Sequence, residues 1–135
     1  MAVKKIKKDI HWVGAIDWDR RLFDELIPLP EGTSYNAYLI KGQKKTALID
    51  TVDPTKEDDL LDNLDDLRIE HLDYIVVNHA EQDHSGAIPL MLELFPEAKV
   101  VTNEKCKKML MEHLLVAEDR IITVKDKDTL SLGGK

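Results

Sequence analysis

Asn-His-Ala-Glu-Gln-Asp-His-Ser-Gly occupies residues 78–86 of the chain. It follows residues 74–77, a short apolar run rich in β-branched side chains, which is typical of a strand buried on both faces of a sheet. Two histidines and two carboxylates therefore stand within six positions directly after a strand. Because loops at strand ends are where a rigid sheet presents ligands, the segment predicts a metal site.

The four candidate ligands are His79, Glu81, Asp83 and His84. In an extended stretch side chains alternate, so the first three are expected on one side and His84 on the other, where it can serve a second metal ion. Imidazole nitrogen with carboxylate oxygen suits iron, zinc or manganese, and the absence of cysteine here disfavours a structural zinc site. The alternative is a polar turn whose side chains merely satisfy backbone groups. Four potential ligands at this spacing favour the metal site.

The segments on either side alternate between strand and helix periodicity, which predicts an α/β fold. A stripe of leucines beside a run of carboxylates predicts a helix over residues 54–67, and Asn103 is expected to cap a later helix that carries Cys106. Without repeats or a linker, the chain is expected to be one unit. The expected strands are residues 35–40 and 46–49, joined by a turn at 41–44, then 74–77, 99–102, and a final pair at 120–124 and 128–132.

Two charged stretches have simple structural interpretations. Four lysines surround Ile6 in an extended segment that reaches Trp12, which predicts a solvated edge strand protected against unwanted pairing. The carboxylates of the helix at 54–67 lack the glycine and the closing glutamate of an EF-hand loop, so they are interpreted as a solvated helix face.

The composition excludes several classes of protein. The chain has 135 residues, 43% of them hydrophobic, one cysteine and a formal net charge of −7. A single cysteine cannot form an internal disulfide framework, and the apolar runs are too short to span a membrane. An acidic balance disfavours nucleic-acid binding, which needs a basic face. We therefore expect a soluble, cytoplasmic protein with no nucleic-acid or membrane partner.

The ligand segment resembles the metal-binding loop of the metallo-β-lactamase superfamily, whose hydrolases carry His-x-His-x-Asp-His. Glu81 stands where the zinc hydrolases have their second histidine, and in this the chain resembles the flavodiiron proteins (A-type flavoproteins), the oxygen and nitric oxide reductases of anaerobes. The resemblance extends to residues 13–14, 17–23, 30–40 and 47–52. It covers essentially the whole chain from about residue 10.

The resemblance implies an α/β fold, half of a metallo-β-lactamase-like αββα sandwich with a mixed sheet and flanking helices. Residues 1–135 would form the N-terminal portion of that domain, with the domain incomplete and the flavodoxin-like domain absent. In the family the full-length protein carries non-haem di-iron and flavin mononucleotide (FMN). It reduces O₂ to water or NO to N₂O with electrons from a rubredoxin or a flavin-reductase-type donor.

Carried over by position, the resemblance implies that His79 and Glu81 bind one iron and that Asp83 and His84 bind the other. The family draws two further histidines and a bridging carboxylate from later loops, and His113 lies on a helix, in the wrong context for such a ligand. The sequence thus encodes half of a di-iron site. We expect the chain alone to be inactive and to self-associate as a homo-oligomer through its uncovered sheet face.

Two alternative functions remain open at this level. One is a non-catalytic O₂- or NO-binding di-iron sensor module, and the other is a zinc-dependent hydrolase of the superfamily, against which Glu81 speaks. Asp50, at the end of the strand 46–49, is expected to brace the loops as a hydrogen-bond acceptor rather than to bind metal. Cys106 is expected to be a small core side chain.

Overall fold

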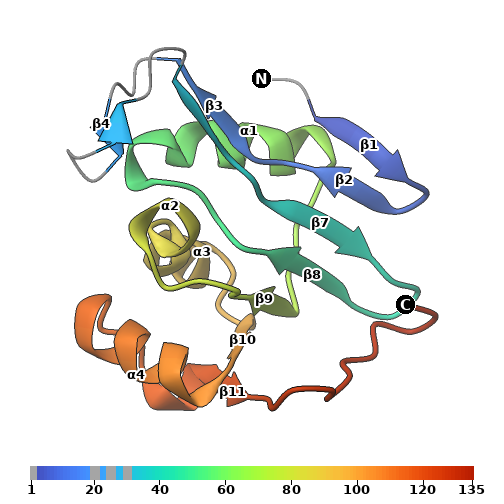
Figure 1. Cartoon of the computed structure of the whole chain (residues 1–135). Coiled ribbons are helices and arrows are strands. Elements are labelled where there is room, and N and C mark those ends of the chain that lie inside the picture. The colour runs from blue at the N-terminus through green and yellow to red at the C-terminus, as the bar shows by residue number, and fades with distance from the viewer. Residues whose placement is uncertain (1–2, 19–21, 24–26, 29–31) are drawn as a thin grey trace.

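The computed structural model describes residues 3–18, 22–23, 27–28 and 32–135. Its centre is a seven-stranded sheet in the order β1-β2-β7-β8-β9-β10-β11 (Figure 1). Two small strand pairs, β3 with β6 and β4 with β5, accompany it. The strands are β1 (Lys4–Lys7), β2 (Ile10–Trp12), β3 (Ala15–Asp17), β4 (Leu22–Phe23), β5 (Ile27–Pro28), β6 (Thr33–Tyr35), β7 (Tyr38–Lys41), β8 (Thr46–Ile49), β9 (Tyr74–Val76), β10 (Lys99–Thr102) and β11 (Ile121–Thr123). Residues 19–21 and 30–31, which belong to the resembling segments, lie outside the described residues.

The sheet is mixed, as predicted. Strands β1, β2, β7 and β8 pair antiparallel, with short turns joining β1 to β2 and β7 to β8, whereas β8, β9, β10 and β11 pair parallel. Parallel neighbours need a crossover connection, and helices supply each one. The helical segments are the 3₁₀ turn η1 (Pro54–Lys56), α1 (Glu57–Asp66), α2 (Gln82–Ser85), α3 (Ile88–Leu94), α4 (Glu104–His113) and the 3₁₀ turn η2 (Glu118–Arg120).

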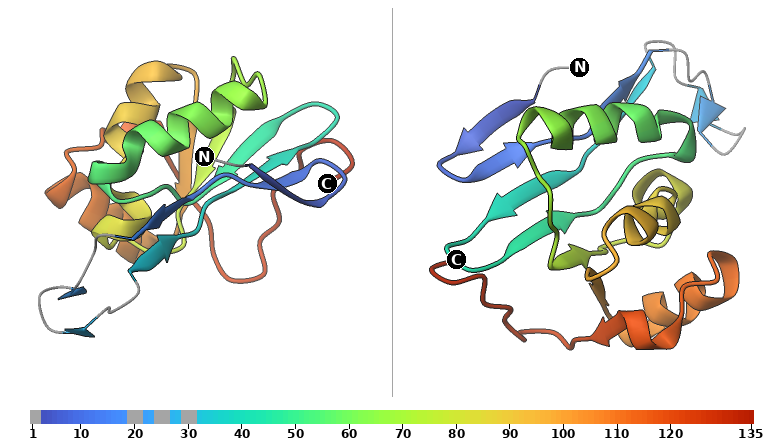
Figure 2. Two further views of the ribbon diagram at one scale, coloured as in Figure 1. Left: turned by 90° about the horizontal axis from the view of Figure 1, so that it is seen from above. Right: turned by 180° about the vertical axis from the view of Figure 1, so that it is seen from behind.

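One face of the sheet carries the hydrophobic core. Helices α1 and α3 lie on this face, as the two views in Figure 2 show. Their buried side chains, Leu60, Leu64, Ile88 and Met91 among them, join a single cluster with the sheet residues Leu39, Leu48, Ile75 and Val100. Cys106 of α4 belongs to the same cluster, which confirms its predicted place in the core.

The opposite face of the sheet is apolar but less covered. Ile10, Ile40, Ile49 and Val76 are half-buried there and line a pocket of about 340 Å³. The C-terminal segment passes this face, and Leu132 reaches the pocket. Its carbonyl accepts hydrogen bonds from the N–H groups of Lys44 and Lys45, in the turn between β7 and β8. This arrangement, one mixed sheet with helices on one face, agrees with the predicted α/β half-sandwich.

Several expected elements differ from the structure in detail. The strand predicted at residues 35–40 is interrupted, because β6 pairs with β3 while β7 pairs with β2 and β8. The final strand pair is wrong: residues 128–132 form no strand, and β11 instead pairs parallel with β10. The predicted edge strand is confirmed in part. All four residues of β1 are exposed at one end of the sheet, but the segment does not run on to Trp12, because the chain turns after Lys7 and β2 pairs back antiparallel with β1. Among the described residues, no helix has the length and apolar character needed to cross a bilayer.

Candidate metal centre

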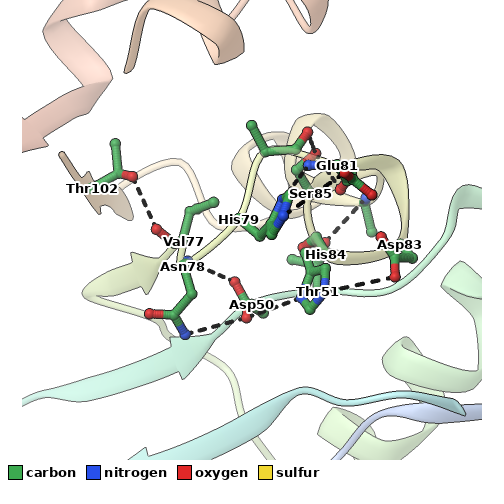
Figure 3. Close-up of polar contacts among 12 residues, drawn as sticks. Asp50, Thr51, Val77, Asn78, His79, Glu81, Asp83, His84, Ser85 and Thr102 are labelled. Atoms are coloured by element: carbon green, nitrogen blue, oxygen red, sulfur yellow. Dashed lines mark hydrogen bonds and ion pairs between the residues drawn. The ribbon is translucent and has the colours of Figure 1, made fainter. Parts of the chain in front are cut away.

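The candidate ligands lie beyond the C-terminal ends of the parallel strands. Asp50 and Thr51 follow β8, residues 77–81 follow β9, and Thr102 ends β10 (Figure 3). The Asp50 N–H donates to the Val76 carbonyl at 2.8 Å, and the Thr102 hydroxyl donates to the Val77 carbonyl at 2.9 Å. Side chains far apart in sequence therefore meet beyond the carboxyl ends of the parallel strands. This is the place where open α/β sheets bind ligands.

The ligand segment is not extended throughout, which corrects one expectation. His79 and Glu81 lie in the connection after β9, whereas Asp83 and His84 lie in the short helix α2. The Glu81 carbonyl accepts the N–H groups of His84 and Ser85 and the Ser85 hydroxyl, and these bonds close the helical turn. Alternation with period two therefore does not continue to Asp83. The spacing of the polar residues predicts a metal site, but it does not predict the helical turn that carries Asp83 and His84.

The four predicted ligands form two pairs. Nε2 of His79 lies 3.8 Å from Oε1 of Glu81, and Nε2 of His84 lies 3.6 Å from Oδ2 of Asp83. The two imidazole rings stack, with centroids 5.3 Å apart and planes at 18°. All four side chains thus gather at the turn, and each pair matches the residues that the resemblance assigns to one iron.

The side chain of Asp50 holds this turn in place through hydrogen bonds. Asp50 is buried and adopts a left-handed backbone conformation with φ of 60°, an uncommon one for a residue other than glycine. Its Oδ1 accepts the Asn78 N–H at 2.8 Å, and its Oδ2 accepts Nδ2 of the same asparagine at 3.3 Å. These contacts fit the predicted loop-bracing acceptor.

Asp50 also fixes the imidazole of His84. Its Oδ2 lies 3.2 Å from Nδ1 of His84. Because an ionised carboxylate can only accept, Nδ1 carries the proton, and the lone pair of the neutral ring is then on Nε2. Metal-binding histidines typically donate their second ring N–H to a carboxylate in this way. The geometry therefore presents Nε2 of His84 as a donor atom.

His79 is held differently. Its Nδ1 lies 3.1 Å from the Glu81 backbone nitrogen, whose N–H it accepts. The ring is about half exposed, as is Glu81, while Asp83 and His84 are more enclosed. Of the two pairs, the one formed by Asp83 and His84 is the more firmly oriented by its surroundings.

The donor chemistry of these side chains fits iron, most clearly at the pair formed by Asp83 and His84. Oδ1 of Asp83 is a buried carboxylate oxygen without a hydrogen-bond partner, which is costly unless a cation or another donor meets it. Imidazole and carboxylate are ligands that iron accepts. Among the described residues, however, no three His, Cys, Asp or Glu side chains converge on one point where a metal could sit. Either pair alone would therefore provide only part of a coordination shell.

Thr51 is a residue that sequence reasoning missed. It is fully buried, and both its backbone N–H and its hydroxyl donate to the His84 carbonyl, each at 2.7 Å. The same hydroxyl accepts the Ala87 N–H at 3.3 Å. Nothing local to residues 46–52 signals this contact, because its partner lies 33 positions away.

Two other sequence expectations concern histidine and tryptophan. His113 is exposed at the end of α4, in agreement with its exclusion from the ligand set. The sequence predicts that Trp12 and Trp18 are both core or dimer-contact aromatics. Trp12 is buried and its indole N–H donates to Oδ1 of Asn36 at 3.0 Å, whereas Trp18 is 65% exposed and does not belong to the core.

Comparison with known proteins supplies the family. The model of the metallo-beta-lactamase superfamily matches residues 30–135. The chain belongs to the metallo-β-lactamase superfamily. Within this superfamily its relatives are flavodiiron proteins, and it corresponds to their N-terminal part.

Three relatives illustrate the match within the superfamily. A nitric oxide reductase of Moorella thermoacetica is 40% identical over 130 residues, which covers 95% of this chain and 32% of the relative. The rubredoxin oxygen:oxidoreductase of Desulfovibrio gigas has a solved structure with a TM-score of 0.92 at 37% identity, covering 98% of this chain and 33% of the other. The flavodiiron protein from Giardia intestinalis gives a TM-score of 0.89 at 28% identity, covering 98% and 32%.

The chain is much shorter than these superfamily members. It spans 34%, 26% and 32% of the first three curated relatives. The similarity establishes the family and the fold of this part.

Proposed function

We propose that the chain forms the N-terminal part of the di-iron domain of a flavodiiron protein that reduces oxygen or nitric oxide. In this proposal His79 and Glu81 hold one iron, and Asp83 and His84 hold the other. The remaining ligands and the FMN belong to parts of the protein beyond this chain. When bound, the iron pair supplies the redox chemistry by which O₂ or NO is reduced.

The observation that carries the proposal is the contact between Asp50 and His84. Nδ1 of His84 is engaged by a buried carboxylate at 3.2 Å, so Nε2 is left as the donor atom, 3.6 Å from Oδ2 of Asp83. A polar turn without a ligand has no need for a buried carboxylate that orients a partly exposed imidazole. The unpartnered Oδ1 of Asp83 supports the same conclusion.

The protein residues have distinct tasks in this proposal. Asp50 orients the His84 ring through Nδ1, in the way that carboxylates behind metal-binding histidines orient those rings. Glu81 adds a negative charge where the zinc hydrolases have a neutral imidazole. A harder, more anionic ligand set favours iron, especially in its higher oxidation states.

Oxygen and nitric oxide are both retained as substrates. The matched relatives include a nitric oxide reductase and a rubredoxin oxygen:oxidoreductase, at similar identity to this chain. The second name also supports rubredoxin as the electron donor. The zinc hydrolase is the weaker candidate, because Glu81 replaces the histidine that its zinc site uses.

An anaerobic titration of the chain with ferrous iron tests the proposal. The matched variants Glu81→Gln and Asp83→Asn remove one charge each at nearly constant shape, and Glu112→Gln and Asp126→Asn do the same at exposed positions away from the turn. We expect iron affinity to fall at least about tenfold in the first two variants and to remain unchanged in the controls. Equal affinity in all five proteins, or no binding to the unaltered chain, would overturn the proposal.

A further inference from the structure

The carbonyl of His84 receives two hydrogen bonds from a single residue. The backbone N–H and the hydroxyl of Thr51 both lie 2.7 Å from this oxygen. The hydroxyl also accepts the Ala87 N–H at 3.3 Å. Thr51 therefore ties the C-terminal end of α2 and the start of α3 to the end of β8, on which Asp50 stands.

Asp50 and Thr51 thus bind two different parts of His84, its side chain and its main chain. Asp50 holds the imidazole of His84 through Nδ1, and Thr51 holds its main chain through the carbonyl. Both come from the same strand end, so a shift of α2 away from Thr51 would also lengthen the contact between Asp50 and the ring. Since Thr51 is fully buried, no water can replace its hydroxyl without rearrangement.

We propose that Thr51 is a positioning residue for His84. Its hydroxyl sets the distance between the imidazole and Asp50, and this keeps the ring proton on Nδ1 and the lone pair on Nε2. This inference rests on the proposed metal site for its purpose. The effect on the ring itself is independent of metal and can be measured without it.

The test compares three variants of the chain. Thr51→Val removes the hydroxyl at constant shape, Thr51→Ser restores it, and Thr102→Val is the matched control. Thr102 is likewise buried at a strand end, and its hydroxyl donates to a backbone carbonyl at 2.9 Å, but that carbonyl belongs to Val77 and not to a candidate ligand. A general loss of a buried hydrogen bond affects both valine variants alike.

The first measurement is the ¹⁵N NMR spectrum of the His84 ring in the metal-free chain. We expect the unaltered protein, Thr51→Ser and Thr102→Val to show the Nδ1–H form, and Thr51→Val to show averaged ring nitrogens. If the His84 spectrum of Thr51→Val is unchanged, the inference is wrong whether or not the chain binds metal.

The second measurement is a titration with cobalt(II) alone, followed by its visible absorption. We expect Thr51→Val to bind about 10- to 100-fold more weakly, with an altered spectrum, while Thr51→Ser and Thr102→Val keep the original affinity. Equal weakening in Thr51→Val and Thr102→Val would reduce Thr51 to a structural role and overturn the inference. Failure of the unaltered chain to bind cobalt would contradict the proposed function, while the NMR result still decides the role of Thr51.

Discussion

Oδ2 of Asp50 lies 3.2 Å from Nδ1 of His84, although the two residues are 34 positions apart in the chain. The contact joins the end of β8 to the helix α2, which carries two of the four candidate ligands. Because the contact occupies Nδ1, it leaves Nε2 of His84 as the nitrogen available to a metal. The candidate metal centre is therefore oriented from the sheet and not from the loop alone.

The variant Asp50→Asn tests this orientation. Asparagine tolerates the left-handed conformation that Asp50 adopts, so the backbone can stay in place. The amide removes the charge that holds Nδ1–H, and we expect about 10- to 100-fold weaker metal binding together with about 1–3 kcal/mol lower stability. Metal titration and urea unfolding measure the two effects. Unchanged metal affinity would show that Asp50 has no influence on the donors.

The variant Glu81→His tests why a carboxylate stands at this position. It converts the segment to the His-x-His-x-Asp-His pattern of the zinc hydrolases. We expect the ratio of zinc to iron(II) affinity to rise about tenfold or more, because a neutral imidazole replaces the hard, anionic oxygen ligand that favours iron. Separate titrations with each metal give this ratio. A ratio equal to that of the unaltered chain would show that Glu81 does not select the metal.

A charged cluster at the N-terminal ends of β9 and β10, opposite the candidate metal centre, predicts a pH dependence of stability. Nε2 of His71 lies 2.9 Å from Oδ1 of Asp73, and Nδ1 lies 3.3 Å from Oε2 of Glu97. The hydrogen bond with Asp73 raises the pKa of His71 above its ordinary value of 6.5. Burial raises the pKa of Asp73, but hydrogen bonds from the Thr46 N–H and from His71 outweigh it and lower that pKa on balance.

The sign of the effect follows from these two shifts. A raised folded-state pKa means that the contribution of His71 is fully present below pH 6.5 and is lost as the pH rises through the folded pKa. The contribution of Asp73 is present above its ordinary pKa of 3.8 and is lost as the pH falls through its lowered pKa.

Urea unfolding of the unaltered chain and of His71→Asn between about pH 5 and 8 measures this dependence. The free energy of unfolding of the unaltered chain should decrease above pH 6.5, and we expect His71→Asn not to show this decrease. Asp73→Asn should have the same effect, and the double variant should add little, since both changes remove one interaction. An identical pH profile in His71→Asn would contradict the assignment.

The less covered face of the sheet predicts self-association. Ile10, Ile40, Ile49 and Val76 line its pocket, and exposed apolar patches favour association. Sedimentation should give a mass above that of the monomer, which rises with concentration. Ile40→Glu should shift the chain toward monomer, whereas Leu115→Glu, at an exposed apolar residue after α4, should not. A monomer at every concentration would rule out association through this face.

The elements that local pattern determines were predicted well. The carboxylates and leucines of α1, the β-branched runs of β9 and β10, and the Asn103 cap of α4 were all expected, and Oδ1 of Asn103 accepts the Cys106 N–H at 2.7 Å. Each of these features depends on residues within one turn or strand. The gathering of His79, Glu81, Asp83 and His84 followed from their closeness in sequence.

The features that depend on distant contacts were missed. Residues 128–132 have a strand-like pattern, yet Leu132 is held by the turn between β7 and β8 and pairs with no strand. Asp83 and His84 are helical because Glu81 and Ser85 close a turn that Thr51 and Pro54 support from another segment. A β-carbon on Gly86 would overlap the ring of Pro54, so this glycine permits the close approach. Tertiary packing, which local periodicity does not encode, decides each case.

The central claim is that the donors of residues 79–84 bind iron. X-ray absorption at the iron edge of the ferrous chain, prepared without oxygen, tests it most directly. The account predicts nitrogen and oxygen neighbours together with the outer-shell scattering of coordinated imidazole, and its loss when both His79 and His84 are replaced by alanine. A spectrum of hydrated iron without imidazole scattering, or one that the double replacement leaves unchanged, would contradict it.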